Sequence, residues 1–476
     1  MTTWEGLPLV EELASPPDVE EAFRRLAGLP HCLFLDSAMR DPTLGRYSFL
    51  AADPFDYFEL PPHGPDALAE LARRMGSHTA LSVPGLPPFQ GGAAGLLSYD
   101  LGRQLERLPT ARFDEFRVPA MAVGLYDVLL ALDHLHDRAW IVSQGFPEVE
   151  PAARRRRAAA RLEQFRGWLT SRALDDGPAK RFLDAGERTR IAADELAPQH
   201  EVPGGKRLAS NFSEADYLAA VARAIEYVRA GDVFQVNLAQ RLLAPVSDDS
   251  VSLYLRLRQR NAATFAGYFD LGDFQILSAS PERFLKVDHR DVETRPIKGT
   301  RPRTSRPEAD RLAGEELAGS VKDRAENVMI VDLLRNDLAR VCRPESVVVS
   351  QLCRLEVYQY VQHLVSAVRG RLRDDCTPID LVRASFPGGS VTGAPKVRAM
   401  EIIAELEPTA RGPYCGALGY MGFDGSLDLN LLIRTITAGR GWWQAPVGGG
   451  IVAQSDPRQE CEETWHKAEG LLRAMF

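Results

Sequence analysis

The chain has 476 residues and a formal charge of −8, from 57 lysines and arginines against 65 aspartates and glutamates, which argues against a broadly basic nucleic-acid-binding surface. Hydrophobic residues make up 45% and charged residues 26% of the chain, values typical of a globular protein rather than a disordered one. Because it lacks a membrane-spanning apolar run, a signal-peptide pattern and any CxxC pair among its six cysteines, we expect a cytoplasmic protein with no membrane partner and no disulfide framework.

Along the chain, three segments differ in character. Residues 1–172 form an N-terminal region of strand-like runs broken by proline and glycine, ending in an arginine- and alanine-rich stretch that predicts a helix over 150–172. Residues 173–210 are polar and aperiodic, and form the expected linker or boundary. In 211–476 strands and helices interleave and hairpin-like pairs are frequent. This pattern predicts an α+β (mixed α/β) fold rather than a doubly wound parallel sheet.

Helix ends in the third segment are marked by local signals. One helix is expected from Ser213 to Gly231, and the last has Asp456 as its N-cap and Pro457 at its first position. Two more are expected over 325–341 and 394–407, and strands over 233–242, 347–358 and 363–372. In the helix over 325–341, apolar spacing places one set of residues on one side, namely Val328, Val331, Leu334, Leu338 and Val341.

Two of these helices carry carboxylates that allow two interpretations. Glu460, Glu463 and Lys467 are spaced i, i+3 and i+7 and share one face of the last helix. That face is either a solvated charged surface or part of a metal site. Glu326, near the start of another helix, either interacts with the helix dipole or joins the same metal. Mg²⁺ takes one or two protein carboxylates and fills its shell with water and substrate oxygens.

Glycine-rich and basic stretches supply further candidates. Residues 386–396 place glycines and small hydroxyls before a helix, as a tight turn or as N–H groups for an anion. The triple glycine 448–450, in an apolar strand, marks a bulge or a close approach to the backbone. Lys298, in the basic stretch 294–303, belongs to a surface turn or, if buried, is a nucleophile. His363, in an apolar run, is a core histidine or a catalyst.

The order of the motifs resembles that of the chorismate-utilising enzymes. Over 213–473 the family's segments follow one another as GDVFQVNLAQR, SASPERFL, TRPIKGTRPR, DRAENVMIVDLLRNDLARV, FPGGSVTGAPKVRAM, YCGALGYMG, GGGIVAQSDP and ECEETWHKAE. The N-terminal runs LFLDSA, GRYSFLAADP and GLLSYD are similar to that family's N-terminal region. The resemblance implies two large antiparallel β-sheets packed as a sandwich, with helices outside.

The resemblance also implies roles for individual residues. Mg²⁺ would lie between Glu326 and Glu463 and bridge to the ring carboxylate of chorismate, offsetting its charge. Glu282 would be the general acid for the departing C4 hydroxyl, which requires a protonated, buried carboxyl group. His363 and Lys467 would orient the ring and the metal carboxylates. Other substrate contacts would come from Arg434 and Tyr414 at the enolpyruvyl carboxylate, from the N–H groups of Gly448, Gly449 and Gly450, and from Ser390 and Thr392 at the ring.

Two positions indicate the branch of the family. Gln235 stands where the water-using isochorismate and salicylate synthases carry a lysine base, so the chain resembles the amine-transferring branch. Lys298 stands where anthranilate synthases usually have alanine and aminodeoxychorismate synthases have this lysine, whose amine blocks ring C2 and directs ammonia to C4. We therefore expect 4-amino-4-deoxychorismate as the product, for 4-aminobenzoate and folate synthesis. The alternative is anthranilate, for tryptophan synthesis, and the intact acidic and lysine positions disfavour a non-catalytic relative.

The chain contains no GxCxG or GxSxG nucleophile elbow. A glutaminase activity of its own is therefore not expected. Besides chorismate, the expected partner is a separate glutamine amidotransferase subunit that supplies ammonia.

Overall fold

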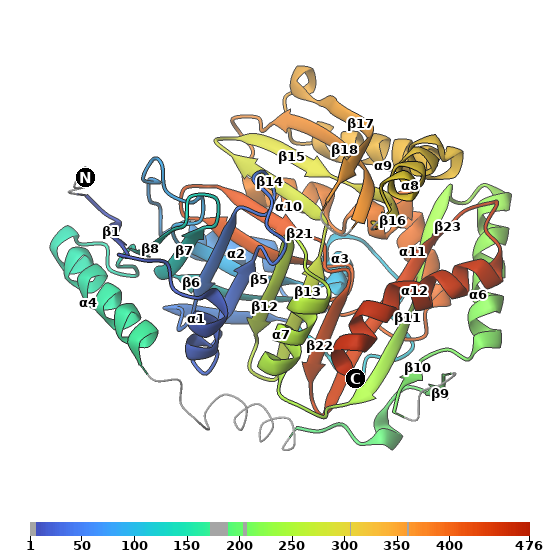
Figure 1. The fold of residues 1–476 in the computed structure, drawn as a ribbon, viewed down its shortest axis with the longest axis horizontal. Helices are drawn as coiled ribbons and strands as arrows, with labels where there is room; N and C mark the ends of the chain where they lie inside the picture. Colours follow the sequence, from blue (N-terminus) through green and yellow to red (C-terminus); the bar gives the residue numbers. More distant parts are fainter. Residues whose placement is uncertain (1–5, 172–188, 203–206, 305, 359–360) are drawn as a thin grey trace.

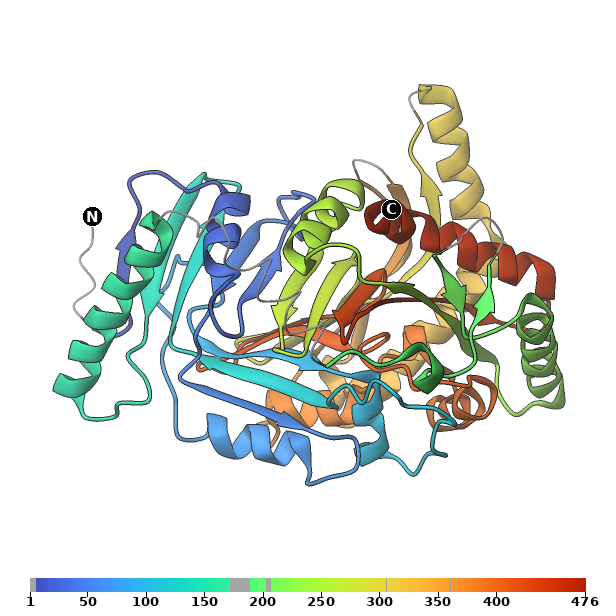
Figure 2. The ribbon, with the colours of Figure 1, turned by 90° about the horizontal axis from the view of Figure 1, so that it is seen from below.

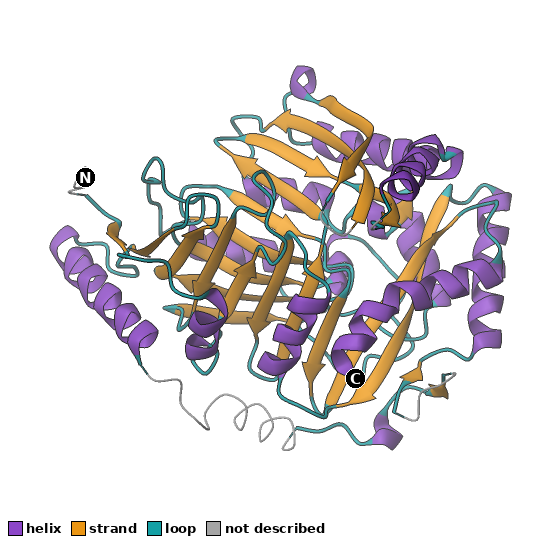
Figure 3. Cartoon of the chain, in the orientation of Figure 1, coloured by secondary structure: helices purple, strands orange, loops and turns teal. Residues whose placement is uncertain are grey.

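Two antiparallel sheets, of 13 and 10 strands, form the body of the molecule (Figures 1 and 3). The computed structural model describes residues 6–171, 189–202, 207–304, 306–358 and 361–476, and the strand counts refer to these. The observed architecture confirms the expected α+β fold with two large antiparallel sheets.

The first sheet has the order β1-β8-β7-β3-β2-β12-β13-β22-β23-β11-β10-β9, with β19 paired to β11. Its strands are β1 (Leu9–Glu12), β2 (Leu33–Asp36), β3 (Tyr47–Ala51), β7 (Val128–Asp133), β8 (Arg138–Ser143), β9 (His200–Glu201), β10 (Ala209–Ser210), β11 (Gln235–Pro245), β12 (Phe265–Asp270), β13 (Phe274–Ser280), β19 (Gly393–Ala394), β22 (Thr435–Gly439) and β23 (Trp442–Ile451).

The second sheet has the order β16-β18-β15-β14-β21-β20-β5-β6-β4, with β17 paired to β18. Its strands are β4 (Asp56–Leu60), β5 (Gly92–Leu97), β6 (Met121–Tyr126), β14 (Arg283–Asp288), β15 (Asp291–Arg295), β16 (Ile297–Pro302), β17 (Val348–Val357), β18 (Val361–Arg371), β20 (Ala417–Gly422) and β21 (Leu427–Asn430). Both sheets combine early and late strands: β2 pairs with β12, and β5 pairs with β20. The sequence segments 1–172 and 211–476 therefore share their sheets, and the boundary over 173–210 stays a prediction about the chain.

Helices cover the outer faces of both sheets. They are α1 (Val19–Leu26), α2 (Ala67–Met75), α3 (Gly102–Leu105), α4 (Pro151–Thr170), α6 (Glu214–Ala230), α7 (Ser250–Arg260), α8 (Pro307–Gly319), α9 (Val321–Ala339), α10 (Pro378–Ser385), α11 (Lys396–Leu406) and α12 (Pro457–Met475). Figure 2 shows α1, α4, α7 and α12 along one side of the sandwich and α2 on the other. No helix in the described ranges is long and apolar enough to cross a membrane.

Three apolar cores hold these layers together. Between the sheets, Leu33 and Phe269 of the first sheet pack with Leu96 and Leu418 of the second. A second core joins the first sheet to α1, α4, α7 and α12, and a third joins the second sheet and β11 of the first sheet to α2, α6, α9, α10 and α11. Burial of this apolar area is the main favourable contribution to folding. All six cysteines are buried and unpaired.

Local end signals are confirmed where they were strongest. The Ser213 side chain accepts the Asp216 N–H at the start of α6, and Gly231, with φ at 86°, ends that helix. At α12, Asp456 accepts the N–H groups of its first turn. The expected apolar side of α9 is wrong at one position: Val331, Leu334 and Leu338 are buried, but Val328 is 48% exposed. At about 100° per residue, Val328 lies about 60° beyond the edge of the buried arc.

Candidate functional site

The candidate residues come from both sheets and from two helices that pack on them. Lys298 lies on β16 and His363 on β18, whereas Gln235 and the triple glycine lie on β11 and β23. Glu282 lies between β13 and β14, where the chain crosses from the first sheet to the second. Arg434 lies between β21 and β22, where the chain crosses back. Chain crossovers thus bring the candidate acid and the candidate carboxylate-binding arginine to the junction of the sheets.

Glu282, Ser390 and Lys298 form one connected group. The Ser390 hydroxyl donates to Glu282 Oε1 at 2.7 Å, and Lys298 Nζ donates to the Ser390 carbonyl oxygen at 3.2 Å. Burial raises the pKa of Glu282 to about 7, and the Ser390 hydroxyl and the Lys298 ammonium oppose that rise. A carboxyl group with this pKa is partly protonated at neutral pH and can both donate and accept a proton. Lys298 therefore lies on a half-buried strand and not in a surface turn.

A second group lies where α12 covers β23. The Lys467 ammonium forms an ion pair with Glu463 at 2.7 Å and donates to the Gly448 carbonyl oxygen at 2.9 Å. A Cβ atom at Gly449 would lie 3.3 Å from Glu460 Oε2. The triple glycine continues in regular register along β11, without a bulge. Close approach of charged side chains to the strand therefore explains Gly449.

The Glu/Lys face of α12 is only partly solvated. Glu460 is 3% exposed and accepts the Ser455 hydroxyl at 2.6 Å, whereas Glu463 and Lys467 are exposed. Partial desolvation raises the pKa of Glu463, but the charge of Lys467 outweighs that effect with help from Lys322 and Lys298, and the net pKa is lowered. Glu463 is therefore ionised at neutral pH.

Glu326 on α9 faces the same cluster. Burial raises its pKa, and the ammonium groups of Lys298 and Lys322 act in the opposite direction. Lys322, one turn earlier on α9, lies 3.5 Å from Glu460. Partial burial lowers the pKa of Lys322, but the carboxylates of Glu460, Glu326 and Glu463 raise it more strongly. Within the described ranges, no three His, Cys, Asp or Glu side chains form a complete protein metal site.

His363 is buried and neutral. Its Nδ1 lies 2.9 Å from the Thr300 hydroxyl, its strand partner, and its Nε2 is buried without a hydrogen bond. Burial, together with the positive charge of Arg434, lowers the pKa of His363 to about 4. The imidazole can therefore donate or accept one hydrogen bond at Nε2, but it carries no charge at neutral pH.

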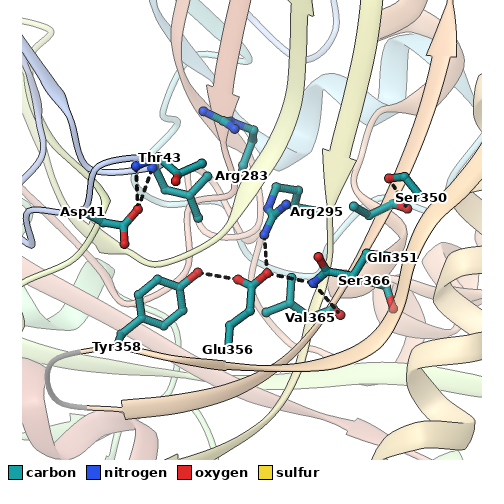
Figure 4. A network of polar contacts seen from close by, with 12 residues as sticks. Asp41, Thr43, Arg283, Arg295, Ser350, Gln351, Glu356, Tyr358, Val365 and Ser366 are labelled. Atoms are coloured by element: carbon teal, nitrogen blue, oxygen red, sulfur yellow. Dashed lines mark hydrogen bonds and ion pairs between the residues drawn. The ribbon is translucent and has the colours of Figure 1, made fainter.

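A polar network braces the strand beside His363. Glu356 pairs with His363 across β17 and β18, and its carboxylate accepts from Arg295 at 2.6 Å, Gln351 at 2.7 Å and Tyr358 at 2.6 Å (Figure 4). Burial raises the pKa of Glu356, but these donors outweigh it, and the net pKa is lowered. The network fixes β17 against β18 and so the backbone of His363.

Three residues that were expected to bind substrate contact other residues of the protein in this structure. Thr392 is fully buried, and its hydroxyl donates to the Gly388 carbonyl oxygen at 3.0 Å. Tyr414 is buried against Arg411, whose guanidinium lies 5.8 Å from its ring centroid. A Cβ atom at Gly450 would lie 1.9 Å from Gln235 Nε2. Their expected contacts with substrate stay predictions.

Motif analysis did not single out Lys322, which lies 3.5 Å from Glu460. Helix spacing did place Glu460 on one face with Glu463 and Lys467, but it did not show that Glu460 is buried against Ser455.

The comparisons with known proteins agree on one family. Residues 40–473 match the sequence profile of the chorismate binding enzymes. The chain is 43% identical over 392 residues to the anthranilate synthase component 1 of Thermus thermophilus, covering 82% of this chain and 79% of that protein. It is 37% identical over 469 residues to the aminodeoxychorismate synthase component 1 of Escherichia coli, covering 95% of each. The solved anthranilate synthase component I of Streptococcus pneumoniae superposes with a TM-score of 0.73 at 30% identity, covering 90% of this chain and 92% of that one.

Proposed function

The chain belongs to the chorismate-binding enzymes, and we propose that it aminates chorismate to 4-amino-4-deoxychorismate, as component I of an aminodeoxychorismate synthase. The observation that carries this proposal is the Lys298 amine, 3.2 Å from the Ser390 carbonyl oxygen in the turn whose hydroxyl binds Glu282. A nucleophile and a protonatable carboxyl group thus share one turn, as an addition coupled to loss of hydroxide requires.

The proposed reaction uses these two residues in sequence. The Lys298 ammonium first loses a proton to solvent. Glu282 then gives its proton to the C4 hydroxyl, which leaves as water, while the Lys298 amine bonds to ring C2 and the ring double bonds shift. Ammonia then bonds to C4, the bond between Lys298 and C2 breaks, and the double bonds return. One proton passes from the incoming ammonia back to Glu282, so that chorismate and ammonia yield aminodeoxychorismate and water.

The carboxylates of Glu326 and Glu463 would hold Mg²⁺. Glu326 is a half-buried carboxylate on α9, and Glu463 faces the same lysines from α12. Two carboxylates suit Mg²⁺, which completes its shell with water and substrate oxygens. Bound there, the ion would neutralise the ring carboxylate of chorismate. Arg434, half-buried at the sheet crossover, would bind the enolpyruvyl carboxylate through its planar fork.

Ammonia would come from a partner. The relatives named above are each called component 1, which supports a second, amidotransferase component for this chain. High ammonium should replace that partner in an assay. We also propose a cytoplasmic location and a place in 4-aminobenzoate and folate synthesis.

The second candidate is anthranilate synthase component I. It is favoured by the 43% identity to the Thermus thermophilus protein of that name. In that reaction ammonia bonds to C2 directly and pyruvate is lost. A lysine amine at C2 would block this route, which is why Lys298 decides between the candidates.

Product identity tests the proposal. The purified chain is incubated with chorismate, Mg²⁺ and ammonium, with and without aminodeoxychorismate lyase. We expect 4-aminobenzoate only when the lyase is present, and loss of this product in Lys298→Ala but not in Lys286→Ala, a control lysine on β14 of the same sheet. Anthranilate without the lyase would assign the chain to the second candidate, and unchanged turnover in Lys298→Ala would refute the covalent step.

A further inference from the structure

Arg411 is a buried cation behind the site, between α11 and β20. Its side chain is 3% exposed, and its guanidinium donates to Glu407 Oε1 at 2.6 Å and Oε2 at 2.8 Å. The centroid of the Tyr99 ring lies 4.7 Å from the guanidinium carbon. None of the roles proposed above uses this residue.

The remaining donors of Arg411 reach two backbone carbonyl oxygens. One is that of Asn237 on β11, at 2.8 Å, and the other is that of Val391, at 3.0 Å. Val391 closes the short helical turn Gly389–Val391 that contains Ser390. Asn237 also donates its N–H to the Thr392 carbonyl oxygen at 2.7 Å. Arg411 therefore ties the turn to the central strand of the site.

That turn contacts both proposed reacting groups, Glu282 and Lys298. Its Ser390 hydroxyl binds Glu282, and its Ser390 carbonyl oxygen accepts from Lys298. We propose that Arg411 is a positioning residue, which acts through the Val391 carbonyl oxygen to hold Ser390 where it aligns Glu282 with Lys298. The proposal rests on the proposed function in one respect, namely that Glu282 is the proton donor.

A lysine at this position would separate the two roles of the arginine. Lysine keeps a positive charge for Glu407, but its single ammonium group lacks the planar fork that reaches Glu407, Asn237 and Val391 together. The turn would then be free to shift by a fraction of an ångström. Misplacement of reacting groups by about 1 Å can lower turnover about a hundredfold, so we expect a smaller shift to lower it about tenfold.

The experiment is a double-mutant cycle of Arg411→Lys and Ser390→Ala, with Arg161→Lys as the matched control. Arg161 is also a buried arginine with carboxylate partners, Asp53 at 2.7 Å and Asp127 at 3.2 Å, but it lies on α4. The rate of chorismate consumption is measured as a function of pH. Both candidate reactions consume chorismate, so this measurement does not depend on which product is formed. Product analysis of the same samples tests the proposed function separately.

We expect Arg411→Lys to lower kcat about tenfold or more with little change in KM. The alkaline limb of kcat should move up by about one pH unit, because loss of the Ser390 hydroxyl bond removes a contact that stabilises the Glu282 carboxylate. Ser390→Ala should show the same shift, and the double variant should show no further shift. Arg161→Lys should leave both kcat and the limb unchanged.

An unchanged alkaline limb in Arg411→Lys, or shifts that add in the double variant, would overturn the proposal. If Arg411→Lys does not fold, Glu407→Gln is measured instead. This variant keeps the Arg411 guanidinium but replaces its carboxylate partner with a neutral amide, which holds the guanidinium less tightly. This variant should shift the limb in the same direction by a smaller amount. No shift in a folded Glu407→Gln would overturn the proposal equally.

Discussion

Replacing Glu282, the proposed catalytic acid, should stabilise this protein at alkaline pH. Burial raises the pKa of Glu282 from an ordinary 4.5 to about 7, so the folded state holds a proton that the unfolded state releases. The contribution of Glu282 to the free energy of unfolding is therefore fully present below about pH 4.5, and it is lost as the pH rises through about 7. For a rise of 2.5 pKa units, the free energy of unfolding lost relative to low pH is about 3 kcal/mol at pH 8 and less than about 1 kcal/mol at pH 5.

Glu282→Gln removes the titration and keeps a side-chain oxygen for the Ser390 hydroxyl. We expect the unfolding free energy of the variant minus that of the wild type to increase by about 2–3 kcal/mol between pH 5 and pH 8. Urea unfolding followed by tryptophan fluorescence measures this difference, and Glu462→Gln, an exposed glutamate on α12, is the control. A difference that is equal at the two pH values would refute the buried, protonated acid.

Three further predictions concern other parts of the site. His363→Asn should lower kcat but leave the alkaline limb in place, because burial lowers the pKa of His363 to about 4 and it does not titrate there; a pH–rate profile checks this. Gly449→Ala should raise KM for chorismate about tenfold with an unchanged near-UV circular dichroism spectrum, because the added Cβ lies 3.3 Å from Glu460 Oε2 and displaces only side-chain ends. Glu326→Gln should weaken Mn²⁺ binding at least about tenfold by isothermal titration, since one of the two proposed carboxylate ligands is lost; equal affinity would place the metal elsewhere.

Local signals in the sequence predicted the ends of helices well, but they predicted less well which face of a helix is buried. The ends of α6 and α12 follow from caps within a few residues, and these interactions form whatever the helix packs against. The exposure of Val328 depends instead on which arc of α9 meets β18, which spacing alone does not contain. Residues with clear periodicity can therefore still be assigned to the wrong side.

The site depended more on tertiary packing than any helix did. Spacing left Glu326 and Glu463 with two interpretations each, because α9 and α12 meet the same lysines only after the sheets have formed. Glu282 lies in a crossover between sheets, and no periodic pattern marks such a position. Motif order, and not local physics, was the signal that grouped these residues before the fold was known.

One compositional signal could have indicated the site without any motif. Of the 57 basic residues only seven are lysines, so this chain uses arginine almost everywhere that a positive charge suffices. Three of the seven, Lys298, Lys322 and Lys467, surround the Glu326 and Glu463 carboxylates. An arginine there would remain charged and could not act as an amine nucleophile, and its broad fork would fill the space that a cation and a substrate carboxylate need. Where a chain strongly prefers arginine, a lysine that faces carboxylates of the site indicates a position that needs a compact or reactive amine, and this argument singles out Lys322 alongside Lys298.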